Sequence, residues 1–267
     1  MITHDLTSTW SRPKLISNPL KRYGLFAIVL IYLILAISDV EFNWSRFLIG
    51  LDRGWAFLSG FFHPNITSRW GEIVVGMRES LTMTVTATAA GILISFPFGL
   101  GAARNLSIRP VYYFSRAVIA ASRSLQEIII AIFFVAMFGF GPFAGFLTIV
   151  FATIGFLAKL IAEEIEDIDA LQVEAIRATG ATWLQTFVYG VLPQIMPRFV
   201  GLCLYRLDIN FRESAVVGIV GAGGIGATLN TAIDRYEFEV AAGILMLIIA
   251  VVIVLEYLSG FVRKRVK

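Results

Sequence analysis

Apolar residues form long runs along this chain, and shorter polar segments separate them. A helix that crosses a lipid bilayer needs about 20 predominantly apolar residues. The second of these runs, at residues 79–100, is rich in threonine, alanine and glycine. Their small side chains let helices approach closely, so this run should lie inside a bundle. The pattern predicts an all-α integral membrane bundle of about six transmembrane helices. We expect these spans over residues 24–37, 79–100, 111–138, 143–162, 199–219 and 240–258.

The composition agrees with a surface that mostly faces lipid. Of the 267 residues, 57% are hydrophobic and 15% are charged, whereas soluble domains carry about 25% charged residues. The mean hydropathy is +0.78. Lys and Arg lie at the ends of the apolar runs and form no patch, so the net charge of +3 does not indicate a nucleic-acid partner. The two histidines, His4 and His63, are isolated in the sequence and predict no metal site.

Basic residues predict the orientation of the chain. Six spans place both termini on one side, and the N-terminal arm, the loop from Arg104 to Arg109 and the C-terminal tail are all basic. The positive-inside rule makes that side cytoplasmic. No small-residue cleavage site follows the first apolar run, so we expect an uncleaved first span. We expect two parts: residues 1–72, with a cytoplasmic arm, the first span and an interfacial loop, and a core of residues 73–267 with a cytoplasmic loop at about 163–198.

That polar loop is too charged for lipid and has a helical pattern. Gly180 interrupts the pattern and predicts a turn between two short helices, and Pro193 predicts the end of the second. Trp183, Leu184 and Phe187 recur at helical spacing and give the second helix an apolar face. A short amphipathic helix that projects from a membrane bundle can bind in a groove of a partner protein.

The same loop resembles a known family. Residues 174–193 read EAIRATGATWLQTFVYGVLP, which is similar to the EAA signature of ABC-importer permeases. Two positions, Ile176 and Gly190, depart from the signature. The stretches at 139–145, 174–181, 189–197 and 204–226 are also similar to permeases of the phosphonate type and to their phosphate- and phosphite-carrying relatives. The residues that match at the signature spacing are Glu174, Ala175, Gly180, Leu192 and Pro193.

This resemblance implies a fold, partners and a function. It implies the type I ABC importer (MetI-like) permease fold in a bacterial inner membrane, with a second copy of the chain in a homodimer. It also implies two ATP-binding cassette subunits and a soluble substrate-binding protein. The matched loop would couple the ATPase to the spans, so that the spans carry phosphonate, phosphite or phosphate by alternating access. Because this chain has no Walker-type phosphate loop, ATP and Mg²⁺ would bind to the partner ATPase, and the chain would be a transport subunit rather than an enzyme.

Three alternatives stay open at this point. The same architecture could carry another small solute, such as methionine or glycine betaine. A membrane-embedded enzyme would need a nucleophile or a metal set, and neither is visible in the sequence. A passive channel would transport its solute without ATP.

Charged residues inside the fifth expected span are the most informative chemical signal. Four charges that faced lipid near the bilayer centre would cost on the order of 10 kcal/mol, so they must face protein or water. At 100° per residue, Arg206, Asn210 and Glu213 share one face. That face is a candidate lining of the substrate pathway, and interhelical pairing is the alternative. Asp208 and Arg212 are four residues apart and can pair within the helix.

The third expected span carries a second charged face. Arg116, Arg123 and Glu127 are spaced by seven and four residues, which predicts a single stripe. Arg123 beside Glu127 could hold an anion weakly enough to release it, so both are candidates for the substrate pathway. A salt bridge that locks the bundle is the alternative.

A glycine cluster, GAGGIG, follows the fifth span. It contains the literal pattern of a dinucleotide-binding turn but lacks the strand and helix that nucleotide binding requires around it. We expect either a close-packed turn or a flexible outer gate whose backbone amides meet an anionic head group. The residues concerned are Gly221, Gly223, Gly224 and Gly226.

Overall fold

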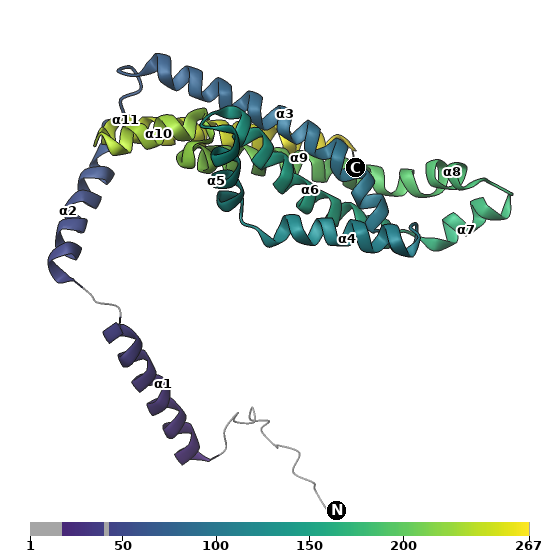
Figure 1. The fold of residues 1–267 in the computed structure, drawn as a ribbon, viewed down its shortest axis with the longest axis horizontal. Coiled ribbons are helices and arrows are strands. Elements are labelled where there is room, and N and C mark those ends of the chain that lie inside the picture. The colour runs from purple at the N-terminus through teal and green to yellow at the C-terminus, as the bar shows by residue number, and fades with distance from the viewer. Residues whose placement is uncertain (1–17, 40–42, 267) are drawn as a thin grey trace, which may run out of the picture. The chain divides into compact units, whose positions relative to one another are not determined.

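The computed structural model describes residues 18–39 and 43–266. Within these ranges the chain forms helices joined by short turns and no β-strand (Figure 1), which confirms the expected all-α class. Of the two short elements, η1 is a π-helical turn, whereas η2 contains a kink with non-helical backbone angles at Val220 and Gly221. In chain order the elements are α1 (Pro19–Asp39), α2 (Trp44–Gly60), α3 (Trp70–Ala102), α4 (Arg109–Ser124), α5 (Glu127–Phe138), α6 (Pro142–Glu166), α7 (Ala170–Ala178), α8 (Trp183–Thr186), η1 (Phe187–Val191), α9 (Leu192–Val217), η2 (Gly218–Ala222), α10 (Gly224–Asp234) and α11 (Phe238–Val266).

The chain divides into two compact units, residues 1–55 and 56–267. In the first unit, the 21-residue α1 contains the expected first span, and its apolar side chains are exposed, as suits a helix surrounded by lipid. In the second unit, residues 56–69 pack onto the start of α11, where the amide of Asn65 donates to the carbonyl of Glu239 at 3.0 Å. The structure therefore groups residues 56–72 with the core, whereas the sequence analysis places the boundary after residue 72.

Among the described residues, five helical segments are long and apolar enough to cross a membrane. The bent pair α4–α5 makes a sixth if it is counted as one span. The number of spans therefore agrees with the expectation. The five segments are α1, α3, α6, the continuous run from α8 to η2, and α11.

Small residues bring α3 close to α6. A Cβ atom added at Gly91 would lie 2.7 Å from Cβ of Thr153, and one added at Gly99 would lie 2.8 Å from Cβ of Ile161. Larger residues at either glycine would push the helices apart. The expectation that this small-residue span lies inside the bundle is confirmed.

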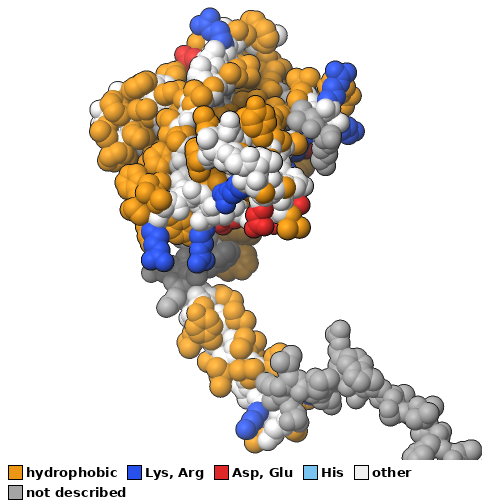
Figure 2. All heavy atoms as spheres, turned by 90° about the vertical axis from the view of Figure 1, so that its right-hand side faces the viewer, with side chains coloured by type: hydrophobic (Ala, Val, Ile, Leu, Met, Phe, Trp, Pro, Cys, Tyr) orange, Lys and Arg blue, Asp and Glu red, His pale blue; other side chains and the backbone are white. Residues whose placement is uncertain are grey.

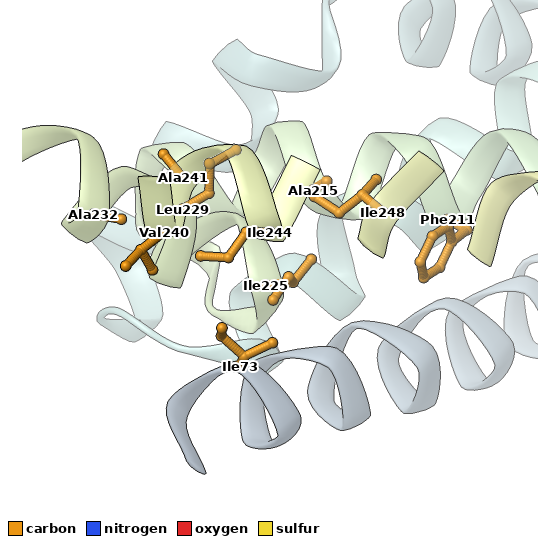
Figure 3. Close-up of a cluster of buried hydrophobic side chains, with 10 residues drawn as sticks. All are labelled: Ile73, Phe211, Ala215, Ile225, Leu229, Ala232, Val240, Ala241, Ile244 and Ile248. Carbon is orange, nitrogen blue, oxygen red and sulfur yellow. The ribbon is translucent and has the colours of Figure 1, made fainter. Parts of the chain in front are cut away.

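A buried apolar cluster joins α3, α9, α10 and α11 (Figure 3). Ile225 of α10 is fully buried in it, so the short helix after the glycine cluster is held against the long spans. This cluster fixes the position of the glycine cluster relative to α3. Its members are Ile73, Phe211, Ala215, Ile225, Leu229, Ala232, Val240, Ala241, Ile244 and Ile248.

The expected third span is not one helix, and that prediction is wrong. α4 and α5 are bent by 90° at the break between Ser124 and Glu127. α4 lies against α3 and α6 through small polar residues: the hydroxyl of Ser122 donates to the carbonyl of Phe151 at 2.6 Å, and Ser115 is buried. α5 has 12 residues and a length of about 18 Å, so it does not span a hydrocarbon core of about 30 Å by itself.

Pro193 does not end a helix, which corrects a second expectation. The chain stays helical from α8 through η1 into α9, and Pro193 lies in the first turn of α9. The amide of Leu192 donates to the carbonyl of Phe187, five residues earlier, so the helix widens by one residue here. In a regular helix the proline ring would clash with the carbonyl four residues earlier. The wider π-helical turn relieves that clash and lets the helix continue.

Candidate functional site

The polar face predicted for the fifth span forms a hydrogen-bonded network inside the chain. Arg206 on α9 is 2% exposed, and its guanidinium meets both carboxylate oxygens of Glu213 at 2.9 and 3.2 Å. Its Nε donates to Oγ1 of Thr153 on α6 at 3.1 Å. One α-helical turn further along α9, the side-chain amide of Asn210 donates to Oγ1 of Thr88 on α3 at 2.7 Å. The face therefore ties α9 to both α3 and α6.

Burial separates the members of this face. Asn210 is fully buried and Arg206 nearly so, whereas the Glu213 side chain is 20% exposed. Within one chain, Arg206 and Asn210 thus make the interhelical pairing that was the alternative in the sequence analysis. A role for the face in a substrate pathway stays a prediction, and Glu213 is its accessible end.

The expected pair of Asp208 and Arg212 forms within α9. Nη2 of Arg212 lies 2.8 Å from Oδ2 of Asp208. The Asp208 side chain is 9% exposed and the Arg212 side chain 49% exposed. The arginine therefore lies at the surface of the single chain, in a segment otherwise apolar enough for lipid.

A pocket of about 310 Å³ between α5 and α9 collects charged residues from both helices. Glu127, Arg212 and Glu213 line it beside apolar residues that include Ile209 and Val216. Glu127 is close enough to interact electrostatically with Glu213 and with the buried guanidinium behind it. Two carboxylates and one exposed arginine therefore meet in one small pocket.

The three residues predicted as one stripe on the third span do not form one. Arg116 on α4 binds Glu166 at the end of α6, with Nη2 2.8 Å from Oε1. Arg123 is exposed near the end of α4, and Glu127 begins α5 on the other side of the bend. Of the three, only Glu127 lines the pocket between α5 and α9.

Two residues that the sequence analysis missed cap the glycine cluster. Oε2 of Glu79 accepts from the amide of Gly224 at 3.1 Å, and Oγ of Ser80 accepts from the amide of Ile225 at 3.0 Å. Both residues lie on α3, 145 positions earlier. The sequence did contain one signal for this contact, the carboxylate of Glu79 at the edge of an apolar run. The neighbouring residues do not reveal its partner, which lies far away in the sequence.

Close packing and unusual backbone angles define the glycine cluster. Gly221, Gly223 and Gly224 have φ values of +96°, +75° and +73°, a region that favours glycine. A Cβ atom at Gly226 would overlap the carbonyl oxygen of Ala215 on α9. The sequence analysis expected either a close-packed turn or a flexible outer gate, and this conformation is a close-packed turn. A role as a gate stays a prediction.

We expect Gly226→Ala to destabilise the chain although alanine favours a helix by about 1 kcal/mol over glycine. The backbone carbonyl of Ala215 cannot rotate away as a side chain could, so α9 and α10 must separate. Gly260→Ala in α11 is the matched control, because a Cβ there meets nothing within 4 Å. Thermal unfolding in detergent should show a lower midpoint for Gly226→Ala alone; equal midpoints for both variants would contradict the packing argument.

The predicted cytoplasmic loop forms a helical hairpin. Asp169 caps α7 by accepting from the amide of Leu171 at 2.9 Å, and Thr182 with Gln185 forms a capping box at the start of α8. Gly180, in the connection between them, has a φ of +83°. The turn predicted at this glycine therefore exists, and each helix has its own start signal.

Apolar side chains are exposed on this hairpin. Trp183 and Leu184 are 60% and 63% exposed, and the Trp183 ring stacks on Phe187 with centroids 5.8 Å apart. Figure 2 views the molecule from the side that bears the hairpin and shows Lys and Arg side chains at several places around a largely hydrophobic surface. Of the signature residues, Leu192 is half-buried, whereas the exposed ones are Glu174, Ala175, Gly180 and Pro193.

No group of three or more His, Cys, Asp or Glu side chains in the described part of the chain could hold a metal ion. His63 lies there and is exposed, whereas His4 lies outside the described residues.

The matched family model covers residues 95–267 and describes the binding-protein-dependent transport system inner membrane component. It spans more than half of the chain, so this chain belongs to that family of membrane transport subunits. The matched region includes the hairpin, α9 and the glycine cluster. The expectations of an inner-membrane protein and of a transport subunit rather than an enzyme are thereby confirmed.

Proteins similar to this chain carry related names. The phosphite transport system permease protein PtxC of Stutzerimonas stutzeri is 36% identical over 92% of this chain and 90% of its own length. The putative phosphite permease HtxC of the same organism is 35% identical over 91% of this chain and 86% of its own length. The phosphate-import permease protein PhnE of Mycolicibacterium smegmatis is 38% identical over 93% of this chain, which spans only 48% of that relative.

Solved structures support the expected fold. A chain of the MetNI methionine ABC transporter, in an inward-facing crystal structure, superposes with a TM-score of 0.68 over 75% of this chain and 99% of its own length. The two are 24% identical. The MetI-like permease fold predicted from the resemblance is confirmed.

Proposed function

We propose that this chain is the membrane-spanning subunit of an ATP-driven importer for a phosphorus oxyanion: phosphonate, phosphite or phosphate. The observation that carries this proposal is the similarity to phosphite permeases over more than nine-tenths of the chain. That similarity extends beyond the family's shared fold. Methionine permeases are related more distantly, at 28% identity over 70% of the chain for the Vibrio cholerae protein.

The exposed hairpin is the proposed contact with the ATPase. Trp183 and Leu184 offer apolar surface at the tip region of a capped, rigid element, and Gly180 fixes the angle between its two helices. Two ATP-binding cassette subunits would bind ATP and Mg²⁺ and move this hairpin. Because α8 continues through η1 into α9, a displacement of the hairpin would be transmitted along one helix to the charged face.

A second copy of the chain is the proposed cover for the face formed by α5 and α9. Arg212 is half exposed there, and a charge that faces lipid near the bilayer centre costs about 2.5–3.5 kcal/mol. A homodimer with a water-filled passage on its two-fold axis would remove that cost. Glu213 and Glu127 from both copies would then line the passage with Arg212. Arg123 does not line the pocket of the single chain, and its proposed place is near the entrance of the passage, at the end of α4.

A passage of this kind suits an anion in transit. The arginines attract the oxyanion, and the neighbouring carboxylates keep the binding weak enough for release. The glycine cluster would form the outer gate, and a soluble substrate-binding protein would deliver the anion to it. With the glycine cluster on the outer side of the membrane, both termini and the hairpin would lie in the cytoplasm, as the basic loops predict.

Transport by the reconstituted complex tests the proposal. The chain, its ATPase and its binding protein are placed in liposomes, and ATP-dependent uptake is measured for phosphonate, phosphite, phosphate, methionine and glycine betaine. We expect uptake of at least one phosphorus oxyanion and none of the other two solutes. Uptake of methionine or glycine betaine alone would refute the substrate class, and uptake without ATP would refute the importer.

A further inference from the structure

A polar pocket lies where α3 connects to α4, away from the charged face of α9. Its volume is about 650 Å³. It is at the same end of the second unit as the hairpin, because Glu166, four residues before α7, binds both Arg116 of α4 and the amide of Arg104. The residues that line it are Arg104, Ser107, Arg109, Tyr112 and Tyr113.

The two arginines of this pocket have no acidic partner among the described residues. Arg104 and Arg109 are exposed and form no ion pair there. The carboxylate of Glu166, which contacts this segment, already accepts from the guanidinium of Arg116 and from the backbone amide of Arg104, each at 2.8 Å. Two guanidinium groups are therefore left for an anion from outside the chain, and their planar donors match the geometry of a phosphate group.

The other polar groups of the pocket also suit a phosphate. The hydroxyls of Tyr112 and Tyr113 form no hydrogen bond within the described parts of the chain, where both residues make only ring contacts, so each can donate to an oxyanion. The rings of these tyrosines contact each other edge to face at 5.3 Å. The hydroxyl of Ser107 is already engaged, because it donates to the carbonyl of Leu100 at 2.7 Å. Four donor groups thus line one concave surface.

Apolar side chains flank the arginines on the same segment. Ile108, Val111 and Phe114 are 68%, 43% and 65% exposed. Tyrosine is enriched at the boundary between lipid and water, and basic residues near the cytoplasmic surface attract anionic lipid head groups. The combination of a phosphate-sized basic pocket and an adjacent apolar surface matches a head group with its acyl chains.

We propose that this pocket binds a phosphate group, either the phosphodiester of an anionic membrane lipid or free inorganic phosphate. The flanking apolar residues support the lipid as the source. The site is separate from the charged face of α9, and it does not depend on which solute is transported.

Binding by the assembled transporter in detergent tests this proposal. Native mass spectrometry during titration with phosphatidylglycerol measures the lipid arm, and equilibrium dialysis with radiolabelled inorganic phosphate measures the soluble arm. For Arg104→Gln/Arg109→Gln we expect at least about tenfold weaker binding in one of the two arms. Each single variant should show an intermediate loss. Since both side chains are exposed, the thermal midpoint should not change.

A matched control removes two charges from the same predicted membrane surface but outside the pocket. Lys264→Gln/Arg265→Gln alters exposed residues of the C-terminal tail, and it should weaken binding only slightly. A selective loss in the lipid arm identifies the lipid phosphate as the ligand, and a selective loss in the soluble arm identifies free phosphate. If the pocket variant and the tail variant bind equally in both arms, the site does not exist. Neither arm uses transport, so this failure is distinguishable from failure of the proposed importer function.

Discussion

Replacement of Arg206 with methionine is expected to lower the stability of the folded chain by about 3–5 kcal/mol, the usual cost of removing one partner of a buried ion pair. The Glu213 carboxylate would lose its partner at 2.9 Å while only 20% exposed. The variant would also lose the hydrogen bond to Thr153 and the stacking of the guanidinium over Phe156 at 5.0 Å. Thermal unfolding of the purified chain in detergent, with the yield of folded protein from membranes, measures this loss.

Two control variants distinguish the effect of breaking a buried ion pair from the effect of removing any arginine of α9. Arg198→Met removes an arginine from the same helix, but its side chain is 60% exposed and its partner is Glu164 at 2.7 Å. Water and salt screen an exposed ion pair, so this change should have little effect on stability. Arg206→Met/Glu213→Leu removes both buried charges and should recover much of the lost stability. Equal losses from Arg206→Met and Arg198→Met would show that the network is not what holds α9.

Local periodicity was sufficient to predict which residues of α9 share a face. Arg206 and Glu213 meet, and Asp208 pairs with Arg212, because 100° per residue is a property of the helix itself. The partners from other helices could not be predicted in this way. Thr88 is 122 positions from Asn210, so only the packing of α3 against α9 brings the two together.

The break between α4 and α5 shows a different limit. No proline or glycine lies at the break, so the apolar and small residues on both sides were interpreted as one continuous span. One signal was present: Arg109, Arg116 and Arg123 recur every seven residues on a stretch with few large aliphatic side chains. Such a helix is amphipathic and suits the surface of a bundle better than a lipid-embedded span. Packing of its small polar residues against α3 and α6 then outweighs continuation of the helix.

The turn of the hairpin was predictable because its signal is local. A glycine between two periodic segments indicates a turn, and the structure places Gly180 at a φ of +83°. The continuation of the helix past Pro193 was not predictable, because it depends on a π-helical turn whose extra residue is set by packing. Gly190 and Val191, which belong to that turn, are buried.

Replacement of Gly180 with valine is expected to lower uptake by the assembled importer by about tenfold or more while the chain stays in the membrane. A left-handed backbone costs most residues about 1–2 kcal/mol, and a β-branched residue more. A Cβ at this position meets nothing within 4 Å, so no clash unfolds the chain. The strain acts on the turn alone and changes the angle at which Trp183 and Leu184 meet the ATPase. ATP-dependent uptake and ATPase activity are measured in the same liposomes.

The control uses the same position. Asparagine tolerates the left-handed region far better than valine does, so Gly180→Asn should keep most of the uptake. Both variants add a side chain of similar size to an exposed turn, and they differ mainly in backbone preference. If Gly180→Val transports as fast as the unchanged chain, or if both variants lose uptake equally, the angle of the hairpin does not control coupling. A loss confined to valine, with the ATPase still able to hydrolyse ATP alone, would place the defect at the contact between the hairpin and its motor.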